Sequence, residues 1–236
     1  KIMGAIYRRE MNSFFSSSIA YVFLSVFFLF SGYFFLAGTL MSATTDMSEM
    51  FSALFLIVLI LIPVLTMKLI SEEKKQKTDQ GLLTAPVSLW GIVLGKYFAT
   101  LTLYTIGLCI TLVYALILSY FGTVMWGIVI SNFLAMFLLG AAFIAVGIFI
   151  SSLTENQITA AASSFLVFIV LYLIDQIASL VNISFIKNIL VSLSFYTRYI
   201  EFTRGIFNLS SVIFYVSVAF VFNFFTVRVF EKKRWS

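Results

Sequence analysis

The sequence predicts an all-α integral membrane protein with six transmembrane helices and shorter amphipathic helices outside them. Hydrophobic residues make up 61% of the 236 residues, and charged residues make up 11%. A soluble domain has about 25% charged residues, so this chain cannot cover an ordinary water-exposed surface. Its apolar residues, with 28 Phe among them, form long runs that contain few charges. Such runs are typical of membrane-spanning helices.

Six apolar runs are long enough to cross a bilayer, which takes about 20 helical residues. They cover residues 19–40, 50–70, 97–120, 124–153, 158–181 and 209–230 of a single domain, 1–236. The fourth run is long, so we expect it to tilt or to extend past the membrane. All six exceed the roughly 9–11 residues of a barrel strand. The first also exceeds the roughly 7–15 apolar residues of a signal peptide, so we expect it to be retained.

The positive charges predict the orientation of these spans. The side of the N-terminus carries most of the Lys and Arg residues, namely Lys1, Arg8, Arg9, Lys68, Lys74, Lys75, Lys77, Lys96, Arg228, Lys232, Lys233 and Arg234. The opposite side carries Lys187, Arg198 and Arg204. Because cytoplasmic loops are enriched in Lys and Arg, we expect both termini in the cytoplasm. The net charge of +5 then reports orientation rather than nucleic-acid binding.

Two segments outside the spans have an amphipathic pattern. Residues 2–18 mix apolar side chains with Arg8, Arg9 and Glu10, which suits an interfacial helix on the cytoplasmic face. Residues 185–207 alternate apolar and charged side chains. We interpret them as short helices that lie in or dip into the outer interface, and an ordinary external loop is the alternative.

The composition excludes several kinds of catalytic and metal site. The chain has no His and a single Cys, Cys109, which lies inside an apolar run. Zinc and haem sites that need His or several Cys therefore cannot form within it. A disulfide within the chain and a Cys/His or Ser/His catalytic pair are excluded as well. We expect neither an enzyme nor a bound metal or cofactor.

Asp175 is the nearest candidate for an ionisable residue at membrane depth. It lies toward the outer end of the fifth run. The favoured interpretation is a polar cap near the outer interface, because ionisable residues inside a membrane are costly. The alternative is part of a substrate path or a contact to the outer loop. With Arg198, Glu201 and Arg204 it forms the candidate pathway or outer gate.

Small residues are concentrated in the fourth and fifth runs, at 140–147 and 160–164. Small side chains let helix backbones approach closely in lipid. The default interpretation is packing within the chain. A dimer seam along the first and fifth spans is the alternative.

Residues 71–96 form the longest polar connection on the basic side. Charged residues at 72–79 precede an apolar stretch that includes Leu82, Leu83, Val87 and Trp90. A solvated connector has no need of these apolar side chains, so we interpret the segment as a short helix that binds a groove of a cytoplasmic partner. An anchor on anionic lipid is the alternative, which Glu72, Glu73 and Asp79 weaken by offsetting the Lys charge.

The same segment resembles a known family. The stretches PVLTM at 63–67, EEKK at 72–75, LLTAPVS at 82–88 and VLGK at 93–96 are similar to the signature of type-2 ABC exporter permeases, most of all the gliding-motility-type branch. IAYV at 19–22, TRGI at 203–206 and KRW at 233–235 extend the resemblance over the full length. Two features depart from it. Lys77, Thr78 and Gln80 replace a Gly-Thr pair with a later Glu, and Ser18 replaces a Pro.

The resemblance implies a permease of the bacterial plasma membrane that pairs with an identical or different second permease. A cytoplasmic ABC ATPase dimer would bind a coupling helix in the 71–96 connection. The residues expected at this contact are Glu72, Glu73, Lys74, Lys75, Thr78, Gln80, Leu82, Leu83 and Pro86. A second cytoplasmic contact is expected at Thr154, Glu155 and Asn156. Residues before the last span would form re-entrant external helices. Membrane lipid and an accessory extracytoplasmic protein are further expected partners, and nucleic acid is not.

The chain lacks the GxxxxGK[ST] phosphate-binding loop, so ATP and Mg²⁺ are expected in the ATPase subunit alone. Two other functions remain open. The first is a membrane anchor or scaffold of a cell-envelope complex that transports nothing, which the scarcity of polar residues in the spans favours. The second is an intramembrane enzyme or a secondary transporter, for which Asp175 and Glu201 are the candidates. The apolar spans favour a lipid-like, peptide or other amphipathic cargo.

Overall fold

The computed structural model describes residues 2–77, 88–180 and 184–235. All regular elements in these ranges are helical, and six of the helices are long and apolar enough to cross a membrane. The protein is therefore an all-helical, multi-pass membrane protein, as the composition predicts. Thr78, Gln80, Leu82, Leu83 and Pro86 lie outside the described residues.

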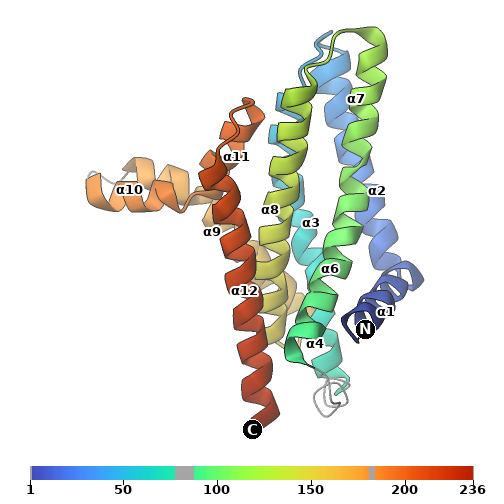
Figure 1. The fold of residues 1–236 in the computed structure, drawn as a ribbon, viewed down its shortest axis with the longest axis vertical. Helices are drawn as coiled ribbons and strands as arrows, with labels where there is room; N and C mark the ends of the chain where they lie inside the picture. Colours follow the sequence, from blue (N-terminus) through green and yellow to red (C-terminus); the bar gives the residue numbers. More distant parts are fainter. Residues whose placement is uncertain (1, 78–87, 181–183, 236) are drawn as a thin grey trace.

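The helices form an elongated bundle with both termini toward one end (Figure 1). The first half of the chain comprises α1 (Ile2–Ser16), α2 (Ser18–Phe35), the π-helix η1 (Leu36–Leu40), α3 (Ser48–Thr66), α4 (Lys68–Lys75), α6 (Leu89–Leu108) and α7 (Ile110–Phe121). The second half comprises α8 (Trp126–Leu153), α9 (Gln157–Leu180), α10 (Ser184–Ser192), α11 (Phe195–Thr203) and α12 (Leu209–Trp235). Helix α1 crosses the foot of α2, and α10 projects sideways from the bundle (Figure 1).

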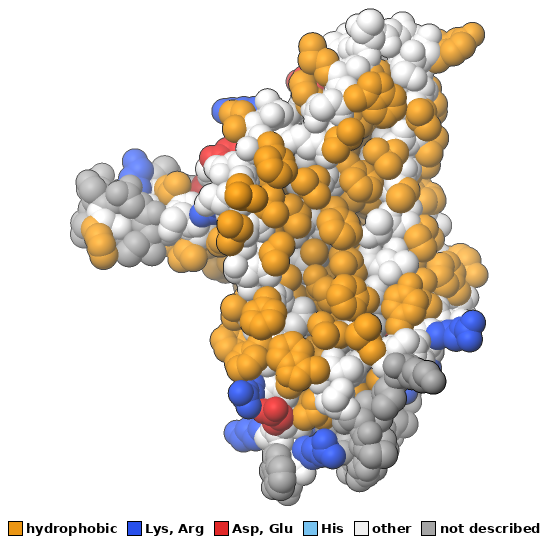
Figure 2. All heavy atoms as spheres, in the orientation of Figure 1, with side chains coloured by type: hydrophobic (Ala, Val, Ile, Leu, Met, Phe, Trp, Pro, Cys, Tyr) orange, Lys and Arg blue, Asp and Glu red, His pale blue; other side chains and the backbone are white. Residues whose placement is uncertain are grey.

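The two ends of the bundle differ in charge. We call the end formed by α1, α4, the start of α6 and the last turns of α12 the basic end. Apolar side chains cover much of the face between the ends in Figure 2, with Lys and Arg gathered at the basic end and near α10 and α11. An apolar belt between two polar ends is the surface expected of a protein that sits in a bilayer.

Helix α8 is the centre of the bundle because its small residues let neighbours approach. It packs against α3, α6, α9, α11 and α12. A Cβ atom on Gly140 would lie 2.2 Å from Cε1 of Tyr104, and one on Gly147 would lie 2.3 Å from Oγ1 of Thr66. Only glycine leaves room for these two contacts, so the predicted packing role of residues 140–147 is confirmed.

The helix that contains the third predicted span begins before residue 97. We expected the span to begin at residue 97, but its helix begins at Leu89, where Ser88 caps it by accepting a hydrogen bond from the Gly91 N–H (3.2 Å). The helix continues through Lys96 because the charge of Lys96 is fully compensated inside the protein. The connection after span two is consequently shorter than predicted.

The role expected for Trp90 is also wrong. We interpreted this residue as part of a partner-binding apolar face. Its ring instead packs within the chain on Phe220 and Phe224 of α12, with centroid separations of 6.1 and 6.2 Å.

Candidate functional site

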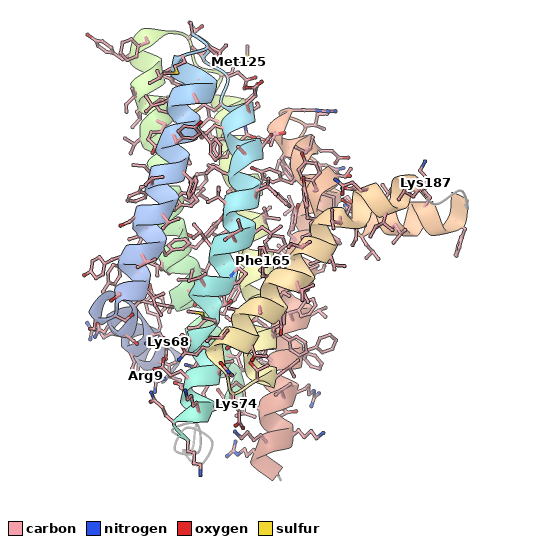
Figure 3. The ribbon with its side chains drawn as sticks, turned by 180° about the vertical axis from the view of Figure 1, so that it is seen from behind. Arg9, Lys68, Lys74, Met125, Phe165 and Lys187 are labelled. Carbon is pink, nitrogen blue, oxygen red and sulfur yellow. The ribbon has the colours of Figure 1, made fainter. Side chains whose placement is uncertain are left out.

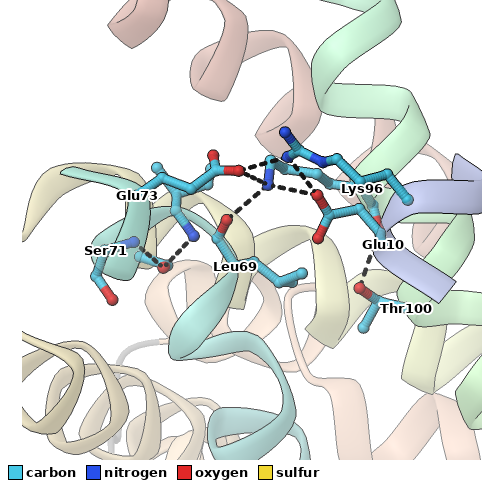
Figure 4. Close-up of polar contacts among 9 residues, drawn as sticks. Glu10, Leu69, Ser71, Glu73, Lys96 and Thr100 are labelled. Atoms are coloured by element: carbon cyan, nitrogen blue, oxygen red, sulfur yellow. Dashed lines mark hydrogen bonds and ion pairs between the residues drawn. The ribbon is translucent and has the colours of Figure 1, made fainter. Parts of the chain in front are cut away.

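Four ionisable side chains from three helices meet at the basic end. Arg9 and Glu10 come from α1, Glu73 from α4 and Lys96 from α6, and we call them the ionic cluster (Figure 4). The Lys96 Nζ lies 3.0 Å from Glu10 Oε1 and 2.9 Å from Glu73 Oε1. The Arg9 Nη2 lies 2.7 Å from the same Glu10 oxygen and 2.5 Å from the same Glu73 oxygen. The cluster thus joins α1, α4 and α6.

Lys96 is the buried centre of this cluster. Its exposed fraction is 0%, and its ammonium donates a third hydrogen bond to the backbone carbonyl of Leu69 (2.8 Å). Removing a charge from water is costly unless opposite charge and hydrogen bonds replace the water. Two carboxylates and one carbonyl supply that replacement. Two positive and two negative groups also leave the cluster without formal net charge.

The electrostatics of Glu10 show that its ionised form is favoured. Burial alone would raise its pKa. The nearby charge of Lys96, together with hydrogen bonds from Arg9 and Lys96, outweighs the burial and lowers the pKa below its usual range. Glu10 therefore stays a carboxylate throughout the physiological pH range.

Close packing holds α1 against α6 beside the cluster. A Cβ atom on Gly95 would lie 2.9 Å from Cγ2 of Ile6, so the absence of a side chain there allows the close approach. The Tyr7 hydroxyl donates a hydrogen bond to Oγ1 of Thr102, which lies about two turns further along α6 (3.1 Å). Helix α1 is thus fixed to α6 by packing as well as by charge.

The other side of α4 is bonded to the end of α8. The Ser151 Oγ accepts hydrogen bonds from the backbone N–H groups of Ile70 (3.3 Å) and Ser71 (3.2 Å), and it donates one to the carbonyl of Met67 (3.1 Å). The Lys74 ammonium donates to the carbonyl of Ser152. Helix α3 ends at Thr66, shortly after Pro63, and a new helix, α4, begins at Lys68. Ile70 and Ser71 lie in the first turn of α4, where backbone N–H groups have no partner within the helix, so they can bond to Ser151.

The structure therefore brings together two predicted contact regions. Glu72, Glu73, Lys74 and Lys75 lie on α4, and the turn of residues 154–156 follows the α8 end that α4 contacts. Glu155, Asn156 and Lys75 are exposed. Figure 3 shows Arg9, Lys68 and Lys74 at this same end. Both predicted regions thus belong to one surface.

A cavity of about 370 Å³ opens beside the ionic cluster. It lies between α1, the start of α2 and α4, and its polar lining includes Ser13, Ser17, Lys68, Glu72 and Gln76. Within the lining, Glu72 pairs with Lys68 (3.2 Å) and accepts a hydrogen bond from the Gln76 amide (3.1 Å).

The ionic cluster was not predicted from the sequence. Arg9 and Glu10 were predicted as parts of an amphipathic pattern, and Arg9 and Lys96 as charges that report orientation. Lys96 was also part of the VLGK stretch. One signal was present. Lys96 is a single charge between the apolar stretches 89–95 and 97–104, and a charge in such a setting requires a partner.

The candidate gate residues make local contacts at the end opposite the basic end. Asp175 accepts hydrogen bonds from Ser194 Oγ (2.6 Å) and Thr197 Oγ1 (2.9 Å), so it ties α9 to the start of α11. This geometry agrees with a contact to the outer segment, which was an alternative to the favoured polar cap near the outer interface. Its half-buried carboxylate is bonded to protein.

The arginines and Glu201 have separate roles. The Arg198 guanidinium donates to the Ser192 carbonyl and lies 4.5 Å from the centroid of the Phe214 ring. Glu201 accepts a hydrogen bond from the Asn208 amide (3.2 Å). Arg204 is exposed and lines a surface hollow with Glu49. These contacts order the segment before α12.

Comparison with known proteins identifies the family. The model of the ABC-2 family transporter proteins matches residues 5–235, which is nearly the whole chain. No curated protein matches the chain.

Proposed function

Since the chain belongs to the ABC-2 transporter family and is a transmembrane permease subunit, we propose that it serves an exporter of the gliding-motility-type branch. A separate cytoplasmic ABC ATPase dimer binds the basic end, and both termini face the cytoplasm of a bacterium. One observation carries the proposal. The short helix α4 is bonded to α1 and α6 on one side and to the end of α8 on the other.

This arrangement suits α4 to transmit force. A displacement of α4 pulls α1 and α6 through Glu73 and Lys96, and it pulls α8 through Ser151 and Lys74. Packed helices respond to such a displacement as rigid bodies, since a close-packed interior does not deform continuously. ATP binding and release in the partner then bias two arrangements of the spans. The present chain contributes no phosphate-binding loop.

The surface for the ATPase combines three features of the basic end. The exposed Lys75 on α4 and the exposed Glu155 after α8 flank the hydrogen-bonded contact between these helices. The cavity of about 370 Å³ between α1 and α4 has room for a partner side chain. Residues 78–87, which lie outside the described residues, belong to this proposal by sequence alone.

A second permease subunit is proposed to cover the spans that are least buried. In its most apolar part α9 is 17% buried, the first span with α2 is 28% buried and α12 is also 28% buried, against 78% for α8. The first and fifth spans are the pair that we propose for this contact. Residues 160–164 of α9 include Ala160 and Ser164, which are buried, and Ala162, which is exposed. Small exposed side chains permit close approach of a second copy or a related permease.

Paired charge reversals at the two ends test where the ATPase binds. The variant Lys75→Glu with Glu155→Lys reverses two exposed charges at the basic end and keeps the net charge. The control Lys187→Glu with Glu49→Lys does the same at the opposite end, where both residues are exposed. Tagged chains are purified from membranes, and co-purifying proteins are quantified by mass spectrometry.

We expect an ABC ATPase with the wild type and the control, and at least a tenfold loss of it with the basic-end variant. Equal ATPase recovery in all three samples would refute the docking surface. No ATPase in any sample would favour the membrane scaffold instead. The variant Glu73→Gln separates docking from coupling, since it should keep the ATPase bound and reduce substrate-stimulated ATP hydrolysis.

A further inference from the structure

A second cavity lies at the end opposite the basic end. It has a volume of about 150 Å³ and lies between residues 45–47, which precede α3, and the first turns of α8. Its apolar lining consists of Met47, Met125, Ile128 and Val129. Met125 is labelled at this end in Figure 3, far from Arg9 and Lys74. A cavity of this size holds a molecule about as large as benzene.

Asn132 lines this cavity with an amide that lacks a hydrogen-bonding partner. The residue has an exposed fraction of 0%, and neither its Oδ1 nor its Nδ2 has a partner among the described residues. The adjacent Ser131 is also buried, but its hydroxyl donates to the Phe202 carbonyl (3.1 Å). A buried amide without partners loses the hydrogen bonds that it makes to water in the unfolded chain, so it lowers the stability of the fold. A molecule that offers one donor and one acceptor to the cavity would remove that cost.

Asp46 adds a negative charge to the same cavity. Its Oδ1 accepts hydrogen bonds from the backbone N–H (2.9 Å) and the hydroxyl (2.6 Å) of Ser48, which orient the carboxylate. Both bonds end on Oδ1, so they do not occupy Oδ2. The described residues that line the cavity include no Lys or Arg, and the remaining polar residue is Thr45. The cavity therefore favours a positively charged guest.

We propose that this cavity binds a primary ammonium group that stands next to an amide. The ammonium group pairs with Asp46, and the amide pairs with both polar atoms of Asn132. The flexible side chains of Met47 and Met125 adapt to the remainder of the guest. An amino-acid amide and the N-terminus of a peptide share this chemistry. The inference rests on the cavity and not on the proposed ATPase contact, so either can fail without the other.

Ligand competition on the purified wild-type chain tests the charge and the amide separately. Saturation-transfer NMR in detergent micelles measures the binding of glycinamide. Acetamide has the amide but lacks the ammonium group. Tetramethylammonium has the positive charge but lacks N–H donors and the amide. Each should therefore bind at least tenfold more weakly than glycinamide. The peptide alanyl-alanyl-alanine amide distinguishes the two sources. Displacement of glycinamide by it supports a peptide N-terminus, and failure to displace glycinamide supports a free amino-acid amide.

Two variants and a matched control locate the binding site. Asp46→Asn removes the charge, and Asn132→Leu removes the amide with little change in shape. Each should weaken glycinamide binding at least tenfold. Asn223→Leu is the control, because Asn223 is a second buried amide with an unpartnered Oδ1, and it lies on α12 outside this cavity. No saturable glycinamide binding to the wild type, or unchanged binding by Asn132→Leu, would overturn the proposal.

Discussion

Each end of the bundle contains a fully buried polar side chain, and the two side chains differ in whether they have bonding partners. At the basic end, the Lys96 ammonium has two carboxylates and a backbone carbonyl within 3.0 Å. At the opposite end, the Asn132 amide has no partner among the described residues. A buried group that is fully satisfied joins helices, whereas one that is unsatisfied costs stability and has to be explained by what it binds. Burial alone therefore does not distinguish a joint from a binding site.

Removing the Lys96 charge should have the largest effect. Lys96→Met keeps the volume but leaves Glu10 and Glu73 with Arg9 as their remaining cationic partner in the cluster. Breaking a buried ion pair by removing one partner costs roughly 3–5 kcal/mol. We expect a loss of that size in the free energy of unfolding, measured by denaturant titration in detergent micelles.

Lys75→Met is the control for this measurement. Lys75 is exposed on the same short helix, so its substitution should change the unfolding free energy by less than about 0.5 kcal/mol. Similar losses for both variants would mean that the cluster is not the joint described here.

Removing the Ser151 hydroxyl tests the other side of α4. Ser151→Ala leaves the N–H groups of Ile70 and Ser71 without this acceptor in a buried place. The expected destabilisation is roughly 1–3 kcal/mol. Ser163→Ala is the control, since the Ser163 hydroxyl donates to the Thr159 carbonyl of its own helix and joins no other described element, so its removal should matter little. A neutral Ser151→Ala would show that the Ser151 hydroxyl does not hold α4, which would leave the ionic cluster and the bond from Lys74 to the Ser152 carbonyl.

The change at the opposite end should have the reverse sign. Asn132→Leu replaces an unsatisfied amide by an apolar side chain of similar size, so the ligand-free protein should become more stable by about 1 kcal/mol. The melting temperature in micelles measures it. A decrease in stability would indicate that water within the cavity satisfies the amide, and the contrast between the two ends would then disappear.

Much of the fold could be predicted from the sequence because membrane helices carry a strong local signal. Long apolar runs set the number of spans, and the basic residues that were expected on one side share one end of the bundle. The packing depth of each span carries no such signal. Helices α8 and α9 are both apolar. In their most apolar parts, however, 78% of α8 is buried and 17% of α9. That difference depends on which helices meet, which is a property of tertiary structure.

The candidate site was predictable only in part, for a similar reason. The position of Glu73 and Lys74 directly after the second span was recognisable from sequence order. Their partners were not, because Arg9 lies 64 residues from Glu73 in the chain and Ser152 lies 78 residues from Lys74. A single charge such as Lys96 signals that a partner exists, but the sequence does not say which carboxylate it is. Helix α1 supplied that carboxylate, although its pattern indicated only an interfacial helix.

The pH dependence of Glu10 gives the smallest and most specific test of the cluster. Its pKa in the folded protein is lower than the 4.5 of the unfolded chain. A carboxyl group with a lowered pKa stabilises the fold above its unfolded pKa, and this contribution is lost as the pH falls through the folded pKa. Glu10→Gln removes the charge and should cost about 1 kcal/mol at neutral pH. The difference from the wild type should begin to shrink near pH 4.5 and vanish below the folded pKa, because the protonated wild-type carboxyl then resembles the amide. Unfolding of both chains in micelles across that range measures this convergence. A difference that stays constant down to the acid limit would mean that Glu10 acts through its shape and packing, and Lys96 would then depend on Glu73 for its compensation.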